Sequence, residues 1–207
     1  QVVLKPAESK YLISKAVVSM DVVKKALAGG TIVLHPSSST YFIVKEITGE
    51  EPLTRHWVPG CILPQGLCVE ANTQEIRPAF DEPGKKFTAD GFPYKWVIKN
   101  RKLSSGIPLG TILEEMNSED VYIKGCNALD IEGNAGVLFG HDGGGTIARV
   151  MKEQKKKGFH VILPVGLEKL IPVSILEAAK ATARNDQFDY GMGMTCGLFP
   201  VSGGTTV

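Results

Sequence analysis

Asp120-Val-Tyr-Ile-Lys-Gly-Cys-Asn-Ala-Leu-Asp130, followed by Gly143-Gly-Gly-Thr146, is the part of the chain that decides the fold class. Its short apolar run predicts a buried strand that ends in a polar loop, and the glycines predict the start of a helix over residues 147–157. Lysines at the end of that helix and Gly158 after it agree with the helix dipole and with a glycine C-cap. The segment therefore indicates a strand, a loop and a helix in that order.

The glycine run is a candidate anion site. Glycines let the backbone approach a ligand closely, and the first turn of a helix leaves N–H donors unpaired at the positive end of its dipole. Gly143, Gly144, Gly145 and Thr146 are therefore predicted to bind an anionic ligand. A flexible glycine-rich turn without a ligand is the alternative interpretation.

A second unit of the same type lies earlier in the chain. Residues 30–47 run from a short apolar stretch through His-Pro-Ser-Ser-Ser-Thr into a helical pattern. Ser39 or Thr40 is expected to cap this helix, because a hydroxyl there accepts a hydrogen bond from a free N–H group. The other hydroxyls, on Ser37 and Ser38, suit the oxygens of a phosphate or a carboxylate. Simple capping, the alternative, needs only one of these hydroxyls.

The rest of the chain continues the alternation of strands and helices. Continuous apolar runs at 121–123 and 161–165 suit parallel strands that are buried on both faces. Further helices are expected over residues 19–28 and 172–183, and a last strand over 197–201. We therefore predict an α/β protein with a parallel sheet and helices on both faces, as a single domain over residues 1–207.

Residues 52–105 have a different composition. Six prolines, at positions 52, 59, 64, 78, 83 and 93, exclude long helices from this part of the chain. We expect a β-rich insertion, with a strand over residues 94–99. Such an insertion either shapes the specificity of a pocket beside the sheet or is a plain surface excursion.

Charge and hydropathy exclude several classes of partner. The net charge is +1, from 23 basic and 22 acidic side chains, so no excess of positive charge favours nucleic acid. No apolar run approaches the roughly 18 residues of a membrane-spanning helix, and the first residues lack a signal-peptide pattern. We expect no nucleic-acid partner, no membrane partner and a cytoplasmic location.

Cysteines provide little evidence for a metal or redox site. The four cysteines, at 61, 68, 126 and 196, show neither metal-ligand pairing nor disulfide spacing, so buried thiols are expected and no metal or cofactor is predicted. Cys126 is the one cysteine within a candidate site. A nucleophilic thiolate beside Lys124 is the minor alternative for it.

The two strand–loop–helix units together resemble the type A ribose-5-phosphate isomerases. Residues 30–40 resemble that family's Gly-Thr opening and its hydroxyl-rich loop, 120–130 resemble its Asp-Gly-Ala-Asp segment, and 159–169 its strand that ends in lysine. The resemblance covers about residues 20–48 and 118–175. It implies the Rossmann-like sheet of the superfamily that also contains glucosamine-6-phosphate deaminases and coenzyme A transferases. It also implies phosphate-holding roles for Ser37, Ser39, Thr40 and Lys169.

The sequence departs from the isomerases at their catalytic positions. Lys124 and Asn127 occupy the positions of two aspartates, and Val150 aligns with the family's glutamate. Neither valine nor asparagine can take the proton that an aldose–ketose isomerisation must remove, so we expect the isomerase mechanism to be absent. Asn127 is kept as a candidate ligand-binding residue.

The remaining candidates for chemistry are Asp130, Glu132 and Lys124. Residues 132–136 resemble the glutamate-and-glycine loop of coenzyme A transferases, in which a carboxylate attacks a thioester. Asp130 is equally suited to cap the turn that follows it.

Two functions stay open. The first is the binding of a small anionic metabolite, phosphorylated or carboxylated and sugar-like, in an isomerase-like pocket made more basic by Lys124. The second is an enzyme of related chemistry, either a sugar-phosphate isomerase or a coenzyme A transferase. We also expect the chain to form a homo-oligomer.

Overall fold

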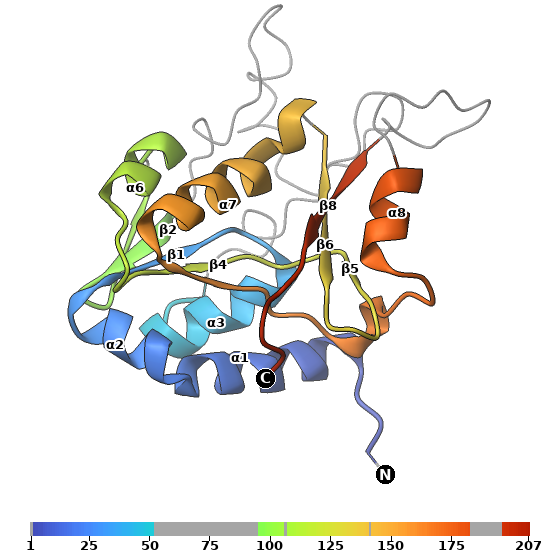
Figure 1. Cartoon of the computed structure of the whole chain (residues 1–207). Coiled ribbons are helices and arrows are strands. Elements are labelled where there is room, and N and C mark those ends of the chain that lie inside the picture. Colours follow the sequence, from blue (N-terminus) through green and yellow to red (C-terminus); the bar gives the residue numbers. More distant parts are fainter. Residues whose placement is uncertain (1, 52–94, 106, 141, 183–195) are drawn as a thin grey trace, which may run out of the picture.

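The structure is a computed structural model that describes residues 2–51, 95–105, 107–140, 142–182 and 196–207. Most of the predicted insertion, residues 52–94, therefore lies outside the described residues, as do Cys61 and Cys68. Helices and strands alternate along the described chain, which confirms the α/β class (Figure 1).

A mixed sheet of five strands forms the centre, in the order β3, β2, β1, β4, β7. The strands β1, β4 and β7 are parallel, whereas β2 pairs antiparallel with β1 and β3 antiparallel with β2. The expected parallel arrangement therefore holds for three strands only. The bounds are β1 Thr31–Leu34, β2 Lys95–Lys99, β3 Lys102–Ser105, β4 Val121–Ile123 and β7 His160–Ile162.

A tight hairpin explains the antiparallel edge. Only Asn100 and Arg101 join β2 to β3, and both have positive φ angles, 51° and 60°. Two-residue turns of this kind fit the twist of antiparallel strands, and parallel neighbours need a much longer crossover. The strand predicted over residues 94–99 is thus confirmed as β2, but it joins the central sheet instead of an outlying lobe.

Helices cover both faces of the central sheet, as predicted (Figure 1). In the view of Figure 1, α1, α2 and α3 lie below the sheet and α6 and α7 lie above it. Glycines in the left-handed conformation end two of these helices, Gly49 after α3 and Gly158 after α7. The bounds are α1 Pro6–Ser19, α2 Asp21–Gly29, α3 Ser38–Thr48, α6 Leu109–Glu115 and α7 Gly145–Lys157.

A second, antiparallel sheet of three strands, in the order β5, β6, β8, stands beside the first (Figure 1). Helix α8, Ile175–Ala181, packs on this sheet through Ile175, which contacts Ala128 and Leu198 in a small core. The last strand was predicted at its observed bounds, but the hairpin of β5 and β6 was not predicted. The bounds are β5 Ala128–Leu129, β6 Ala135–Phe139 and β8 Gly197–Val201.

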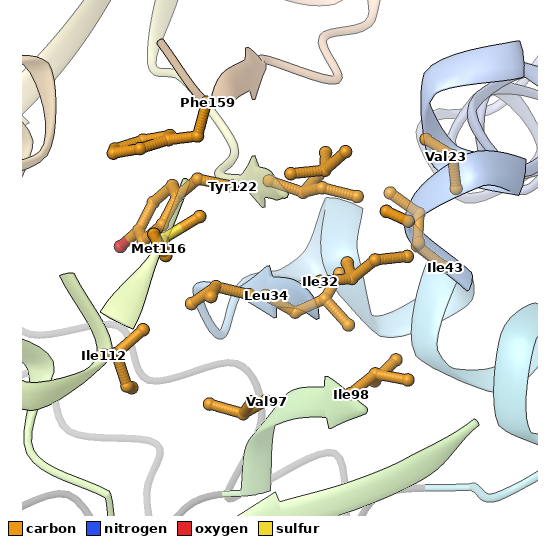
Figure 2. Packing of buried hydrophobic residues seen from close by; sticks show 14 of the residues in the cluster. Val23, Ile32, Leu34, Ile43, Val97, Ile98, Ile112, Met116, Tyr122 and Phe159 are labelled. Atoms are coloured by element: carbon orange, nitrogen blue, oxygen red, sulfur yellow. The ribbon is translucent and has the colours of Figure 1, made fainter. Parts of the chain in front are cut away.

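The main core lies between the central sheet and its helices (Figure 2). All three residues of β4 are fully buried, as expected for a strand covered on both faces. Figure 2 shows side chains from β1, β2 and β4 meeting side chains of the helices, such as Val23 and Ile43. Phe159, the residue directly before β7, packs in the same core. Burial of this apolar surface supplies the main stabilisation and fixes the strand ends that carry the candidate site.

Candidate functional site

The carboxyl ends of β1, β4 and β7 meet at one edge of the central sheet. The backbone N–H of His35 donates to the Ile123 carbonyl at 2.9 Å, and the N–H of Lys124 donates to the Ile162 carbonyl at 3.1 Å. These bonds extend the ladder by one residue beyond each strand, so the loops that follow start side by side. In open α/β sheets this edge is where ligands bind.

The serine loop, residues 35–40, leads from β1 into α3. Ser37 is the N-cap: its Oγ accepts the Thr40 backbone N–H at 3.2 Å. The Thr40 hydroxyl donates to the His35 carbonyl at 2.7 Å, and Ser38 Oγ accepts the Lys10 ammonium at 2.9 Å. The expectation that Ser39 or Thr40 caps the helix is therefore wrong, because the helix begins one turn earlier at Ser38. Three of the four hydroxyls have partners within the protein.

Gly125 brings the loop after β4 against the serine loop. A Cβ atom at this glycine would lie 3.0 Å from Ser37 Oγ and 3.6 Å from Ser39 Oγ. Any larger residue would have to displace the capping hydroxyl. The fold therefore brings together Ser37, Ser39 and the backbone next to Lys124.

Lys124 follows directly on β4 and is the unusual charge of this edge. Its side chain is half-buried, and burial lowers the pKa of its ammonium group to about 8. Within the described residues, no hydrogen bond or ion pair of the ammonium is found. A buried cation without a carboxylate partner is energetically costly, and an anionic ligand would offset that cost.

Three further groups lie in this region: His35, on which the charge of Lys124 acts, Tyr122 beside His35, and Arg149, whose charge acts on Tyr122. Burial, and secondly the charge of Lys124, hold the pKa of His35 well below its usual value, so its imidazole is neutral at pH 7. Tyr122 Oη lies 3.4 Å from His35 Nδ1, and burial raises the pKa of that phenol while the charge of Arg149 on α7 lowers it. Lys124 and Arg149 therefore carry the positive charge beside a neutral His35 and Tyr122. Neither His35 nor Tyr122 was a predicted site residue, although each lies within the two quoted strand ends.

Lys169 and Cys126 have structural contacts. The Lys169 ammonium donates to the Cys126 carbonyl, which ties the loop after β7 to the loop after β4. The Cys126 side chain packs among Ala135, Val137 and Ile147, and burial raises the pKa of its thiol. These observations favour the buried thiol over the nucleophilic thiolate.

Asn127, Asp130 and Glu132 belong to the β5–β6 hairpin. Asn127 Oδ1 accepts the Leu138 backbone N–H at 3.0 Å. The buried carboxylate of Asp130 accepts backbone N–H groups of Glu132, Asn134 and Ile175, at 3.0, 2.8 and 2.9 Å, and the Asn134 side-chain amide at 3.0 Å. Glu132 is exposed at the turn. The contacts of Asp130 support the capping interpretation over a catalytic role.

Replacing Asp130 with asparagine is expected to lower thermal stability by several degrees at neutral pH and to leave anion binding unchanged. The Ile175 backbone N–H, first, and the other donors lower the pKa of Asp130 from its usual 3.8. A lowered pKa contributes stability above pH 3.8 that is lost as the pH falls through the folded-state value. The difference in unfolding temperature between the two proteins should therefore shrink in acid. Loss of anion binding without loss of stability would contradict this structural role.

The glycine run lies between β6 and α7. Gly143, Gly144 and Gly145 all have left-handed backbone, with φ of 77°, 89° and 57°, and they lead into α7 without a side-chain cap. A Cβ on Gly144 would lie 3.0 Å from the Phe199 ring, so close packing on β8 explains this glycine. Figure 1 shows α3 starting below the central sheet and α7 starting above it, beyond the end of β6. Ile147, in the first turn of α7, packs with Cys126 of the loop after β4, and the single cleft expected between the serine loop and Gly143–Thr146 stays a prediction.

A pocket of about 230 Å³ lies at the opposite edge of the sheet, where β1 and β4 begin. Glu115, Glu119 and Asp120 line it, and Asp120 accepts the backbone N–H groups of Thr31 and Asn117 at 2.7 and 2.8 Å. None of the predicted site residues lines this pocket. Its three acids outnumber its one lysine, Lys99, and disfavour an anion, so we place the candidate site at the carboxyl edge.

The described part of the chain lacks two classes of feature. No helix there is long and apolar enough to cross a membrane. No group of three histidine, cysteine or acidic side chains there is arranged to hold a metal ion.

Comparison with known proteins finds no matching family model, no matching curated protein and no matching solved structure. The resemblance to the ribose-5-phosphate isomerases therefore stays a prediction from the sequence.

Proposed function

We propose that this chain binds a small anionic metabolite, phosphorylated or carboxylated and sugar-like, at the carboxyl edge of β1 and β4. The observation that carries the proposal is the half-buried Lys124, whose ammonium has no acidic partner among the described residues. Its position also supports the proposal, because ligands of open α/β sheets bind at this edge. The ligand would neutralise the buried cation.

Neighbouring groups support an anion of limited size. Ser37 caps the first turn of α3, whose dipole is positive at this end, and Gly125 lets the loop after β4 approach this helix end closely. On the side of α7, Arg149 places a second positive charge near Tyr122. Phosphate and carboxylate groups are the common metabolite groups that accept such bonds.

A Rossmann-like pocket of the isomerase superfamily is the architecture we propose for this site. The three parallel strands with helices on both faces are consistent with it. In this proposal the pocket has lost ribose-5-phosphate isomerisation. The transferase alternative gains no support, because the Asp130 carboxylate is occupied by hydrogen bonds and Glu132 lies exposed on a turn. Formation of a homo-oligomer stays a prediction.

A thermal-shift screen tests the proposal. Sulfate, phosphate, sugar phosphates, sugar acids and coenzyme A esters are each added to the full chain. An anion present at about 100 times its dissociation constant should stabilise the native state by about 2.7 kcal/mol, a rise of several degrees in unfolding temperature. Matched uncharged sugars serve as controls. Equal shifts with charged and uncharged compounds, or no shift with any anion, would overturn the proposal.

A further inference from the structure

Helix α1 presents an apolar surface that no described part of the chain covers. The helix runs along the bottom of the molecule in the view of Figure 1. Only Ser14 and Val17 of this helix are buried, whereas the side chains of Tyr11 and Leu12 are 47% and 51% exposed. A hollow of about 400 Å³ beside them is lined by Leu4, Ala7, Glu8, Tyr11, Leu12 and Phe42. An exposed and mainly apolar hollow of this kind is typical of a contact surface.

The exposed residues of α1 are arranged symmetrically along the helix. Six of them form pairs at equal distances from a point between positions 11 and 12: Tyr11 and Leu12, Glu8 and Lys15, and Ala7 and Ala16. They lie in two rows with a spacing of four residues, 7-11-15 and 8-12-16, so they form adjacent ridges of one helix face. If two copies of α1 pack antiparallel about a two-fold axis at that point, each residue faces the other member of its pair. Glu8 of each copy then faces Lys15 of the other.

We infer that α1 is the contact surface of a homodimer, in which two copies of the helix pack antiparallel about an axis between Tyr11 and Leu12. The occupant of the surface is a second copy, because a two-fold contact requires each surface to carry both members of every charge pair, on opposite sides of the axis. Glu8 and Lys15 meet this requirement around an apolar centre. The inference is independent of the proposed anion site, which lies at the strand ends.

Both charges are available to a second copy. Glu8 Oε2 accepts the Lys5 backbone N–H at 2.7 Å, and no described residue bonds the other oxygen of this carboxylate. Lys15 Nζ lies 2.6 Å from Glu46 Oε2 and 5.3 Å from the centroid of the Tyr11 ring, yet the Lys15 side chain is 47% exposed. An ammonium has three donors, so it can keep Glu46 and also reach a second carboxylate. The aliphatic stem of Lys15 then covers part of the hollow beside Glu8 of the other copy.

The size of this surface determines the strength of the dimer. Helix α1 has 14 residues, which gives a length of about 21 Å at about 1.5 Å per residue. Ridges with a spacing of four residues cross at about −50°, which shortens the contact. One helix per copy therefore buries less than the roughly 800 Å² per partner of a standard stable interface. We expect a weak, reversible dimer whose population rises with the concentration of the chain.

Sedimentation velocity of the full chain at concentrations up to about 1 mM, where weak complexes form, tests the inference. The wild type should shift from monomer to dimer as the concentration rises. Leu12→Glu, Glu8→Lys and Lys15→Glu should each raise the dissociation constant at least about tenfold, because they put charge into the apolar centre or make like charges face each other. Lys24→Glu makes the same charge change at an exposed position of the neighbouring α2 and should dimerise like the wild type. Thermal unfolding shows whether each variant is folded.

The decisive experiment mixes the two charge variants. The Glu8→Lys chain carries positive charge at both positions and the Lys15→Glu chain negative charge at both, so each repels its own copy and attracts the other. An equimolar mixture should form a heterodimer at concentrations at which neither variant dimerises alone, a result that misfolding cannot produce. The inference is overturned if the wild type stays monomeric over this range, if its dimer is indifferent to these changes, or if the mixture stays monomeric. Binding of a monomeric chain to lipid vesicles through Leu12 would also overturn it.

Discussion

Replacing Lys124 with glutamate is expected to weaken the binding of sulfate or a sugar phosphate by about 100-fold or more. The variant puts a negative charge where the proposal requires a positive one, and removing one member of a buried charge pair commonly costs several kcal/mol. Lys124→Met should lose about as much of the attraction without adding repulsion. The measurement is isothermal titration calorimetry of each variant with sulfate.

The pH dependence of sulfate binding provides an independent check. Sulfate keeps its charge over this range, so the titrating group is Lys124. Its pKa of about 8 predicts full affinity below pH 8 and a decline of about tenfold per pH unit above it. The decline ends at the pH at which Lys124 also loses its proton in the sulfate complex. An affinity that stays constant to pH 10, or that falls equally in Lys124→Met, would contradict the assignment.

Matched variants show whether weaker sulfate binding comes from the lost charge or from unfolding. Lys155→Glu makes the same charge change on an exposed turn of α7, far along the chain from the sheet edge, and should bind like the wild type. Lys124→Arg should bind sulfate within about tenfold of the wild type, because a guanidinium also pairs with anions. Cooperative thermal unfolding of every variant is the condition for interpreting its affinity.

The sequence predicted the elements that are determined by residues within them or next to them in the chain. The burial of β4 follows from a continuous apolar run, and the end of α7 follows from Gly158, which adopts the left-handed conformation with φ of 75°. The bounds of β8 are those predicted. In each case the residues that decide the element lie within it or next to it.

Tertiary contacts decided what the sequence could not predict. The direction of β2 depends on its pairing with β1, which lies more than 60 residues earlier in the chain. The role of Asp130 depends on Ile175, 45 residues away, and α1 buries only Ser14 and Val17, too few for a clear helical period. The displacement of the cap from Ser39 to Ser37 reflects the choice among adjacent hydroxyls, each of which is a good N-cap.

The candidate site was predicted in part. The serine loop and the loop after β4 adjoin through Gly125, because parallel strands bring their carboxyl ends to one edge. The glycine run follows the β5–β6 hairpin in the chain, Ile147 after it packs with Cys126, and its part in the anion pocket stays a prediction. The depth at which Lys124 is buried depends on packing around it and is not visible in the sequence.

Turnover of ribose 5-phosphate is expected to be at least 100- to 10,000-fold below that of a competent isomerase, the usual cost of losing a general base. The structure adds a physical reason to the sequence comparison. Val150, aligned with the family's glutamate, is fully buried at 0% exposure within the main core, so no carboxylate reaches the site from this position of α7. Asn127 uses its Oδ1 to accept the Leu138 N–H, and an amide is not a base.

A coupled assay for ribulose 5-phosphate formation measures this, with a type A isomerase as the positive control and Lys124→Met as the background. The buried Asp130 carboxylate, six residues after Lys124, is held by four hydrogen bonds. Turnover above about 1 per second, an ordinary enzyme rate, would show that another residue acts as the base and that the alignment of Val150 is wrong.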